Sequence, residues 1–259
     1  MGASYQNKTQ LYTNKSRNMK FKLFTTVFLF IFLTSCHNFF GEHIHGDGNI
    51  KKENRSVSTF TGVDVSGGLD IYVKQDSATS VTIETDANLQ QYIITRVEDG
   101  VLHIYQENNT SIEGTKGITI HVSNPSFNSF EASGACDIRG ENKIQYANEI
   151  QLHATGASNI ELDLNAPKVS GEISGASGLK LSGTTKDLMI NASGASNAKC
   201  YELMTENADV DLSGASSANV FASVKITGEA SGASDLRYKG SATTVTVNTS
   251  GAGSVKKEN

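Results

Sequence analysis

A four-residue motif, Ser-Gly-Ala-Ser or a close variant of it, recurs through the second half of the chain. Its glycines are Gly134, Gly156, Gly175, Gly194, Gly214, Gly232 and Gly251. Subtracting successive glycine numbers gives spacings of 22, 19, 19, 20, 18 and 19 residues. A self-similar period of about 20 residues is typical of stacked repeat architectures. This period therefore constrains the fold more strongly than any local preference for helix or strand.

Apolar and polar residues alternate on both sides of each motif, which is typical of a β-strand with one buried face. Before Gly156, for example, Leu152 and Ala154 enclose the polar His153. Each repeat therefore predicts a strand, a sharp corner at the glycine, a second strand and a looser third side. Such a coil can bury its inward row only by stacking on other coils.

The residues of the corner follow from this geometry. Glycine suits a sharp turn because such turns often need a positive φ. We expect the alanine after it to point inward, and the serines to bond to nearby backbone or to their copies one coil away. Parallel crossovers are right-handed in about 98% of cases. The sequence thus predicts an all-β fold: a right-handed parallel β-helix of about seven coils of roughly 19 residues, with a less regular N-terminal β cap.

The N-terminal region has the pattern of a lipoprotein signal peptide. Lys20 and Lys22 precede an apolar run at residues 23–33, which is shorter than the ~20 residues of a membrane-spanning helix. Cys36 follows Leu-Thr-Ser and resembles the lipidated cysteine of a bacterial lipobox. We expect Cys36 to carry a lipid that anchors the chain to a membrane of the cell envelope, the outer membrane being favoured. The sequence does not indicate whether the chain faces the periplasm or the outside.

Four segments are predicted along the chain. Residues 1–35 form an upstream extension and the signal peptide, and residues 36–56 form the lipidated cysteine and a polar tether. Residues 57–124 carry strand patterns without the glycine period, including a hairpin signal at Asp99-Gly100. We expect them to cap one end of the β-helix and so hide an open strand edge. Residues 125–259 hold the regular repeats.

The charge of the chain argues against nucleic acid as a partner. The first 35 residues carry five of the 22 lysines and arginines and no acidic residue, so the processed chain has 17 basic and 27 acidic residues, a balance of −10. Nucleic-acid binding requires a basic patch that neutralises phosphates. One column of the repeat is basic, and we interpret it as a solvated face; its members are Arg139, Lys180, Lys199, Arg237 and Lys256.

The cysteines and histidines predict neither a disulfide nor a metal site. Cys136 and Cys200 lie in different columns three coils apart, about 14 Å at ~4.8 Å per coil, which is too far for a disulfide. Cys200 falls in an apolar column and is expected to be buried. His43 and His45 have the spacing of an H-x-H metal motif, but no array of Cys, Asp or Glu beside them completes a set. We therefore expect no metal and no cofactor.

Several segments resemble a known family. The sequences FTGVDVSGGLDIYV at 60–73, VTIETDAN at 81–88 and EDGVL at 98–102, together with the serial Ser-Gly-Ala-Ser motifs, are similar to the head GIN domain family. The Gly-Ile-Asn element that names this family would fall on Gly68-Leu69-Asp70, where two of three positions differ conservatively. The resemblance implies a β-helical domain on the envelope of Bacteroidetes, described as an auto-transporter adhesin. It supplies no catalytic residues.

Three functions are compatible with these observations. The first is a lipid-anchored, non-catalytic envelope protein that binds or adheres through its β-helical surface, with a glycan or a protein as the ligand. The second is a structural or sensory module of the periplasm. The third is a polysaccharide-acting enzyme, whose candidate acids would be Glu131, Glu172, Asp211 and Glu229. Because these acids recur in one outward column, they favour a structural face over a catalytic site, and we expect no enzyme activity.

Overall fold

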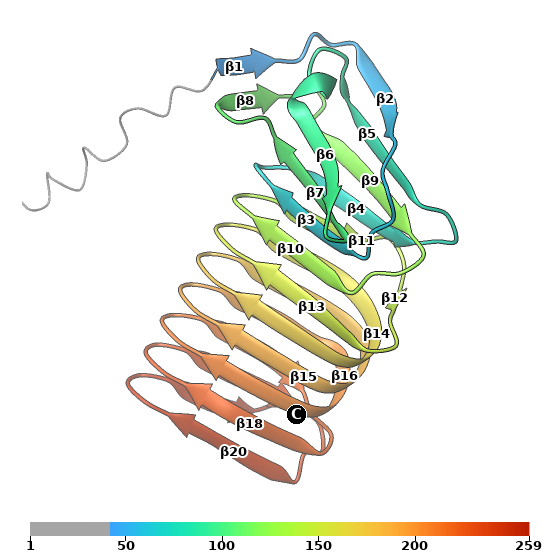
Figure 1. Cartoon of the computed structure of the whole chain (residues 1–259). Coiled ribbons are helices and arrows are strands. Elements are labelled where there is room, and N and C mark those ends of the chain that lie inside the picture. The colour runs from blue at the N-terminus through green and yellow to red at the C-terminus, as the bar shows by residue number, and fades with distance from the viewer. Residues whose placement is uncertain (1–41, 259) are drawn as a thin grey trace, which may run out of the picture. The chain divides into compact units, whose positions relative to one another are not determined.

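The computed structural model describes residues 42–258, and this part of the chain is built of β-strands with a single 3-10 turn, η1 (Gln90–Tyr92) (Figure 1). The strands are β1 (Glu42–His45), β2 (Ile50–Arg55), β3 (Gly62–Ser66), β4 (Asp70–Gln75), β5 (Ser80–Asp86), β6 (Ile93–Glu98), β7 (Val101–Gln106), β8 (Thr110–Glu113), β9 (Thr119–Asn124), β10 (Ser129–Ser133), β11 (Asp137–Gly140), β12 (Ile144–Gln145), β13 (Glu149–Ala154), β14 (Asn159–Ile173), β15 (Gly178–Ala192), β16 (Asn197–Leu212), β17 (Ser217–Phe221), β18 (Lys225–Ala230), β19 (Asp235–Lys239), β20 (Thr244–Thr249) and β21 (Ser254–Lys257).

The repeats form a parallel β-solenoid, as the glycine period predicts. The long strands β14, β15 and β16 each run from just after one corner to just before the next, and β14 pairs in register with β15 over almost its whole length. Figure 1 shows β10, β13, β18 and β20 lying one below another along the stack. The solenoid has about six turns. The sequence predicted about seven coils from its seven corners, which is close to this number.

Two faces meet at the corners. The leading face consists of the strands before the glycines: β3, β10, β13, the ends of β14, β15 and β16, then β18 and β20. The trailing face consists of the strands after them: β4, β11, the beginnings of β14, β15 and β16, then β17, β19 and β21. Each face alternates buried and exposed residues, so its outward side chains form straight rows.

The corner glycines all have φ between 70° and 87°. From Ala157 onward, each motif alanine donates its backbone N–H to the glycine carbonyl of the preceding coil, at 2.7–2.8 Å. The prediction that these alanines point inward is wrong. Alanines such as Ala176 are exposed, whereas the next residue, Ser177 in that coil, is buried. Because the glycine turns through a positive φ, the second residue after it faces the interior.

The buried serines form a polar row inside an otherwise apolar stack. Their hydroxyls bond to nearby backbone: Ser216 Oγ donates to Ser213 O at 2.8 Å, and Ser234 Oγ donates to Ser231 O at 2.7 Å. Ser216 Oγ and Ser234 Oγ also lie 3.5 Å apart, one coil from each other. Each hydroxyl is therefore supplied with a partner where water is excluded. Both expected kinds of serine bond are present.

A β-bulge explains the one spacing of 20 residues among the regular coils. In the pairing of β15 with β16, Lys180 faces Lys199 but Ser182 faces Glu202, so β16 holds one extra residue. An extra residue on one strand is the definition of a bulge. The bulge keeps Cys200 and Leu203 buried while Tyr201 and Glu202 turn outward.

The N-terminal end is less regular, and the solenoid begins earlier than the motif suggests. Strands β3 and β4 pair in parallel with β10 and β11, and the turn between them, at Gly67 and Gly68, has positive φ like the later corners. Above this layer, β7 and β9 continue the parallel stack, while β2, β5 and β6 pair antiparallel. The predicted hairpin at Asp99-Gly100 joins β6 to β7 and is confirmed, with both residues at positive φ.

Part of the segment expected to be a tether is folded. Residues 42–45 form β1, which pairs in parallel with β8, and residues 50–55 form β2, which pairs antiparallel with β5. The other residues of the expected tether before position 42 lie outside the described part. These polar residues form strands because their backbones pair with strands far along the chain. The local sequence pattern did not indicate this pairing.

The two ends of the stack differ. At the N-terminal end, antiparallel strands lie against the first coil, whereas β20 and β21 each pair with one strand only, β18 and β19. Val245 in β20 is 44% exposed. Within residues 42–258, the C-terminal coil therefore has an open edge.

A single apolar core runs through the solenoid and its N-terminal layers. Phe127 packs between Phe60 and Phe130, with ring centroids 6.4 and 5.3 Å away, in the N-terminal part of this core. Cys136 and Cys200 are not bonded to each other and Cys200 is buried, as expected; Cys136 is buried as well, which was not predicted. Among the residues that the structure describes, no helix is long and apolar enough to cross a membrane.

Candidate binding surface

A continuous row of outward polar side chains runs along the leading face of the described residues. Parallel pairing without register shifts places one residue of each coil directly above the next, about 4.8 Å apart. We call this row the acidic ladder; in spatial order it contains His103, Asp64, Glu131, His153, Glu172, Asn191, Asp211, Glu229 and Asn248. Five of its nine members are carboxylates, and no lysine or arginine interrupts it.

Two of the five carboxylates in the ladder lie beside a histidine of the same row. His103 Nδ1 lies 2.8 Å from Asp64 Oδ2, and His153 Nδ1 lies 3.4 Å from Glu172 Oε2. Within residues 42–258, no basic side chain lies within ion-pair distance of the other three carboxylates, those of Glu131, Asp211 and Glu229. Asp211 Oδ1 accepts a hydrogen bond from Glu229 N at 2.9 Å, whereas the carboxylates of Glu131 and Glu229 face solvent and can accept hydrogen bonds from a ligand.

A row of hydroxyl groups runs beside the acidic ladder, directly before the corners. We call it the hydroxyl ladder; its members are Ser133, Thr155, Ser174, Ser193, Ser213, Ser231 and Ser250. The two ladders together line a shallow groove that extends over several coils, from His153 and Thr155 to Glu229 and Ser231. Carboxylates accept hydrogen bonds and hydroxyls both donate and accept them, so the groove can contact a polar ligand at repeated intervals.

The basic column predicted from the sequence lies on the trailing face. The strand register places Glu161 between Arg139 and Lys180, where Lys180 Nζ binds Glu161 Oε1 at 2.6 Å. This hydrogen bond raises the pKa of Lys180. Arg139 is paired with Asp137 at 2.6 Å. The column is thus interrupted by an acid and partly paired, which agrees with its interpretation as a solvated face.

The N-terminal end of the same column carries an aromatic pair that sequence reasoning missed. Tyr72 and His121 are neighbours in register and stack with ring centroids 5.4 Å apart, and the Arg139 guanidinium lies 5.9 Å from the Tyr72 ring centroid. These three residues are far apart in the sequence. Only the pairing of β4 with both β9 and β11 brings them together.

The four acids considered as catalytic candidates are all exposed members of the acidic ladder. They stand one to a coil, and His153 and Asn191 occupy the same row in the coils between them. The candidates therefore form one open row along the leading face, and none of them is set apart from the repeat.

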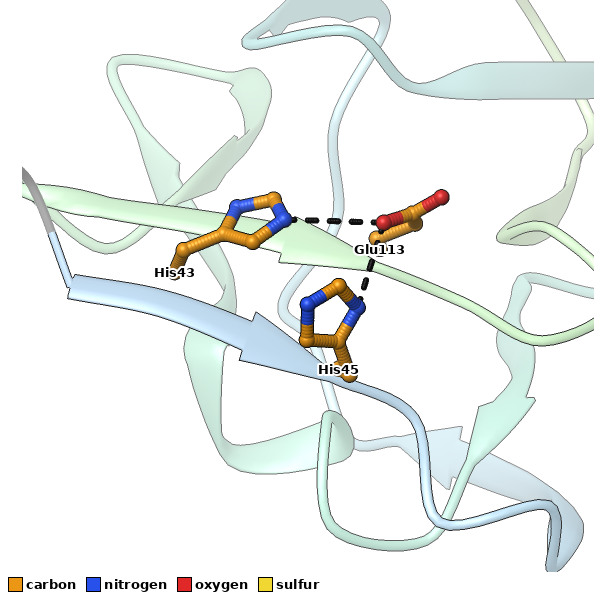
Figure 2. Close-up of side chains that lie close together, drawn as sticks. All are labelled: His43, His45 and Glu113. Carbon is orange, nitrogen blue, oxygen red and sulfur yellow. Dashed lines mark ion pairs between the residues drawn. The ribbon is translucent and has the colours of Figure 1, made fainter.

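A second cluster joins residues that the sequence left apart. Strand pairing sets His45 opposite Glu113, and His43 lies on the same side of β1 two residues earlier. His43 Nε2 and His45 Nδ1 lie 3.5 and 3.2 Å from Glu113 Oε2 (Figure 2). Glu113 is the acid that the H-x-H motif lacked, and it comes from β8. No local signal in the sequence could have found it.

Cys36, the expected lipidation site, lies outside the described residues, so the anchor stays a prediction. The seven corner glycines lie at the border between the two faces, each with a positive φ.

The coils, the glycine corners and the polar outward rows define the class: a parallel β-helix with extended polar faces. The sequence matches the model of the family described as "Putative auto-transporter adhesin, head GIN domain" over residues 59–242, and the chain belongs to this family. The predicted resemblance is thereby confirmed.

Solved structures share the fold. A "putative adhesin" from Bacteroides fragilis superimposes with a TM-score of 0.79 at 21% identity, covering 83% of this chain and 100% of its own. A "putative lipid binding protein" from Parabacteroides distasonis gives 0.71 at 19% identity, covering 84% and 100%. A "putative adhesin" from Parabacteroides merdae gives 0.67 at 17% identity, covering 84% and 100%. A search of curated proteins finds no match.

Proposed function

We propose that this chain is a lipid-anchored protein of the bacterial outer membrane whose β-helix is a non-catalytic adhesive module. The observation that carries the proposal is the groove between the acidic and hydroxyl ladders. It repeats the same chemistry over several coils and is not concentrated at one point. Membership of a family described as adhesins supports the same role. Fold alone does not define function, so the surface chemistry has to carry the argument.

The repeat suits a ligand that is itself repetitive and polar. Asn191, Asp211 and Glu229 follow one another at successive coils, and each is flanked by a hydroxyl of the neighbouring ladder. Sugar hydroxyls can donate to carboxylates and accept from serine hydroxyls and amides. Many weak contacts along one polymer add up when they are made at the same time. We therefore propose a polysaccharide as the ligand class.

The acidic ladder also limits the choice of ligand. A polyanionic polymer would meet Glu131, Asp211 and Glu229, which carry no compensating cation in the described part of the chain. Like charges across an interface disfavour binding. Neutral or cationic polysaccharides are therefore the expected ligands, and polyanionic ones are expected to be rejected.

The test measures binding of the full chain to immobilised neutral, amino-sugar and acidic polysaccharides. The triple variant Glu172→Gln, Asp211→Asn and Glu229→Gln keeps the shape of the ladder and removes its charge. We expect this variant to lose roughly ten-fold or more in apparent affinity, because hydrogen bonds to ionised groups are about twice as strong as neutral ones.

The matched control is the double variant Lys180→Gln and Lys199→Gln on the trailing face, which should bind like the unmodified chain. No binding to any polysaccharide, or equal loss in both variants, would refute the proposed groove. Binding to a protein ligand alone would replace the ligand class.

The anchor and its location need a separate experiment. A Cys36→Ala variant should fail to incorporate a fatty-acid label and should leave the membrane fraction. Protease treatment of intact cells, with lysed cells as the control, then decides the exposed side. Digestion on intact cells is required for adhesion to an external surface, and protection would contradict it.

A further inference from the structure

From the geometry of His43, His45 and Glu113 we infer a divalent transition-metal site that clips β1 to β8. This inference does not rest on the proposed adhesive function. The three side chains are the only group of three ligating residues in the described part of the chain whose donor atoms all lie within 4.8 Å of one another. Figure 2 shows the two imidazole rings and the carboxylate pointing toward a common space.

Strand geometry explains why the three residues share one side. Ile44 packs against the core, and its partner in register, Ile112, is buried. Since side chains alternate along a strand, His43 and His45 must project from the opposite side of β1, and Glu113 projects from the same side of β8. The apolar side of this two-stranded sheet thus fixes the position of the polar side.

The distances match those of a metal site. Zinc binds imidazole nitrogen and carboxylate oxygen at about 2.0–2.2 Å in tetrahedral geometry, which places neighbouring ligand atoms about 3.3 Å apart. The two contacts of Glu113 Oε2, at 3.5 Å to His43 Nε2 and 3.2 Å to His45 Nδ1, have this length. The ligating nitrogens of His43 and His45 lie within 4.8 Å of each other. The two rings meet edge to face with centroids 4.5 Å apart, and rotation of an exposed ring can adjust the separation of the nitrogens to the tetrahedral value.

The chemistry of the donors selects the metal. Two imidazoles and one carboxylate suit Zn²⁺, Ni²⁺ or Cu²⁺ better than Ca²⁺ or Mg²⁺, which prefer oxygen. The side chains of His43, His45 and Glu113 are 52%, 68% and 65% exposed, so the metal can enter without unfolding. A tetrahedral ion held by three residues keeps a fourth position for water.

The site would act on the first strand of the fold. β1 pairs with β8 alone, and a two-stranded sheet is marginally stable in water. The other bonds close by are few: Gly46 N donates to Glu113 O at 2.9 Å, and Asn88 Nδ2 donates to His45 O at 2.8 Å. A metal bridging both strands would therefore hold β1 in place where the folded domain meets the segment that leads to the expected anchor.

The experiment titrates the full chain, prepared without a polyhistidine tag, with ZnCl2 in competition with a chromophoric chelator. We expect one Zn²⁺ per chain. His43→Ala, His45→Ala and Glu113→Ala should each weaken binding at least about ten-fold, because loss of a residue that merely supports a ligand already costs 10- to 100-fold. Hydrogen exchange at the β1 amides should slow with Zn²⁺ in the unmodified chain and stay unchanged in His45→Ala.

The matched control is the double variant His121→Ala and His153→Ala. Each of these histidines contacts one glutamate, at 3.3 Å for Glu141 and 3.4 Å for Glu172, without a second histidine. The control should bind Zn²⁺ like the unmodified chain. Circular dichroism and thermal unfolding in EDTA should be equal for the unmodified chain and the three single variants, because all three substituted side chains are exposed. Absence of stoichiometric binding, or binding that survives Glu113→Ala or His45→Ala, would overturn the site.

Discussion

The close contact between corner glycines of successive coils predicts that Gly175→Ala is strongly destabilising. A Cβ atom at Gly175 would lie 2.5 Å from the carbonyl oxygen of Gly156 and 3.1 Å from its nitrogen, and φ at this position is 76°. Two costs therefore add. The left-handed backbone costs a non-glycine residue about 1–2 kcal/mol, and the clash must push the corner outward. That movement weakens the ladder bonds from Ala176 N to Gly156 O and from Ala195 N to Gly175 O, at 2.7 and 2.8 Å.

Gly100→Ala separates the two costs. Gly100 has nearly the same φ, 77°, but a Cβ there would meet nothing within 4 Å. The Gly100→Ala variant should be destabilised only by the strained backbone conformation. Gly175→Ala also weakens two hydrogen bonds, each of which contributes about 0.5–1.5 kcal/mol. We expect Gly175→Ala to be less stable than Gly100→Ala by about 1–3 kcal/mol in urea unfolding, and to melt several degrees lower. Equal losses in the two variants would show that the corners are not in contact and refute the reasoning.

Three further predictions concern the interior. Burial raises the pKa of the Cys200 thiol to about 12 and also raises that of Cys136, so neither should react with a thiol reagent until the chain unfolds; fast labelling of the native chain would contradict this. Burial alone would raise the pKa of Asp86, but hydrogen bonds from Thr115 and Gly48 hold it below its ordinary value. The stability that Asp86 contributes is therefore complete above about pH 4 and is lost as the pH falls through its lowered pKa. The urea midpoint of the unmodified chain should fall more steeply with decreasing pH than that of the Asp86→Asn variant. Ser216→Ala should destabilise by about 1 kcal/mol through its lost buried hydrogen bond, and an unchanged urea midpoint would contradict it.

The repetitive half of the fold could be predicted because its information is local. The glycine period predicted the positions of the corners. The alternation of apolar and polar residues predicted which strand residues are buried, including Leu152 and Ala154. The corner itself was harder, since the inward direction of Ser177 follows from the positive φ of Gly175 and not from alternation. The earlier corner at Gly67 was not predicted because a second glycine and Leu69 replace the Ala-Ser of the motif.

The candidate sites depend on contacts between distant residues, which spacing cannot reveal. Glu113 meets His45 only because β1 pairs with β8, and β1 is a short strand whose alternation gives no strong signal. Glu161 neutralises Lys180 because it occupies the same column one coil earlier. The repeat period alone places Glu161 in this column, so this neighbour could be found from the sequence.

The different ends of the stack have a consequence for assembly. A filament grows when one surface of a protein fits a different surface on the next copy, and it stops when a surface can pair only with itself. Among residues 42–258, β20 and β21 each leave one edge unpaired, while β2, β5 and β6 run antiparallel at the N-terminal end. A copy that docks on the open edge therefore finds no matching parallel edge to continue the stack. Two molecules could join by their C-terminal coils into a closed pair, and the antiparallel strands at the other end would disfavour the addition of further copies.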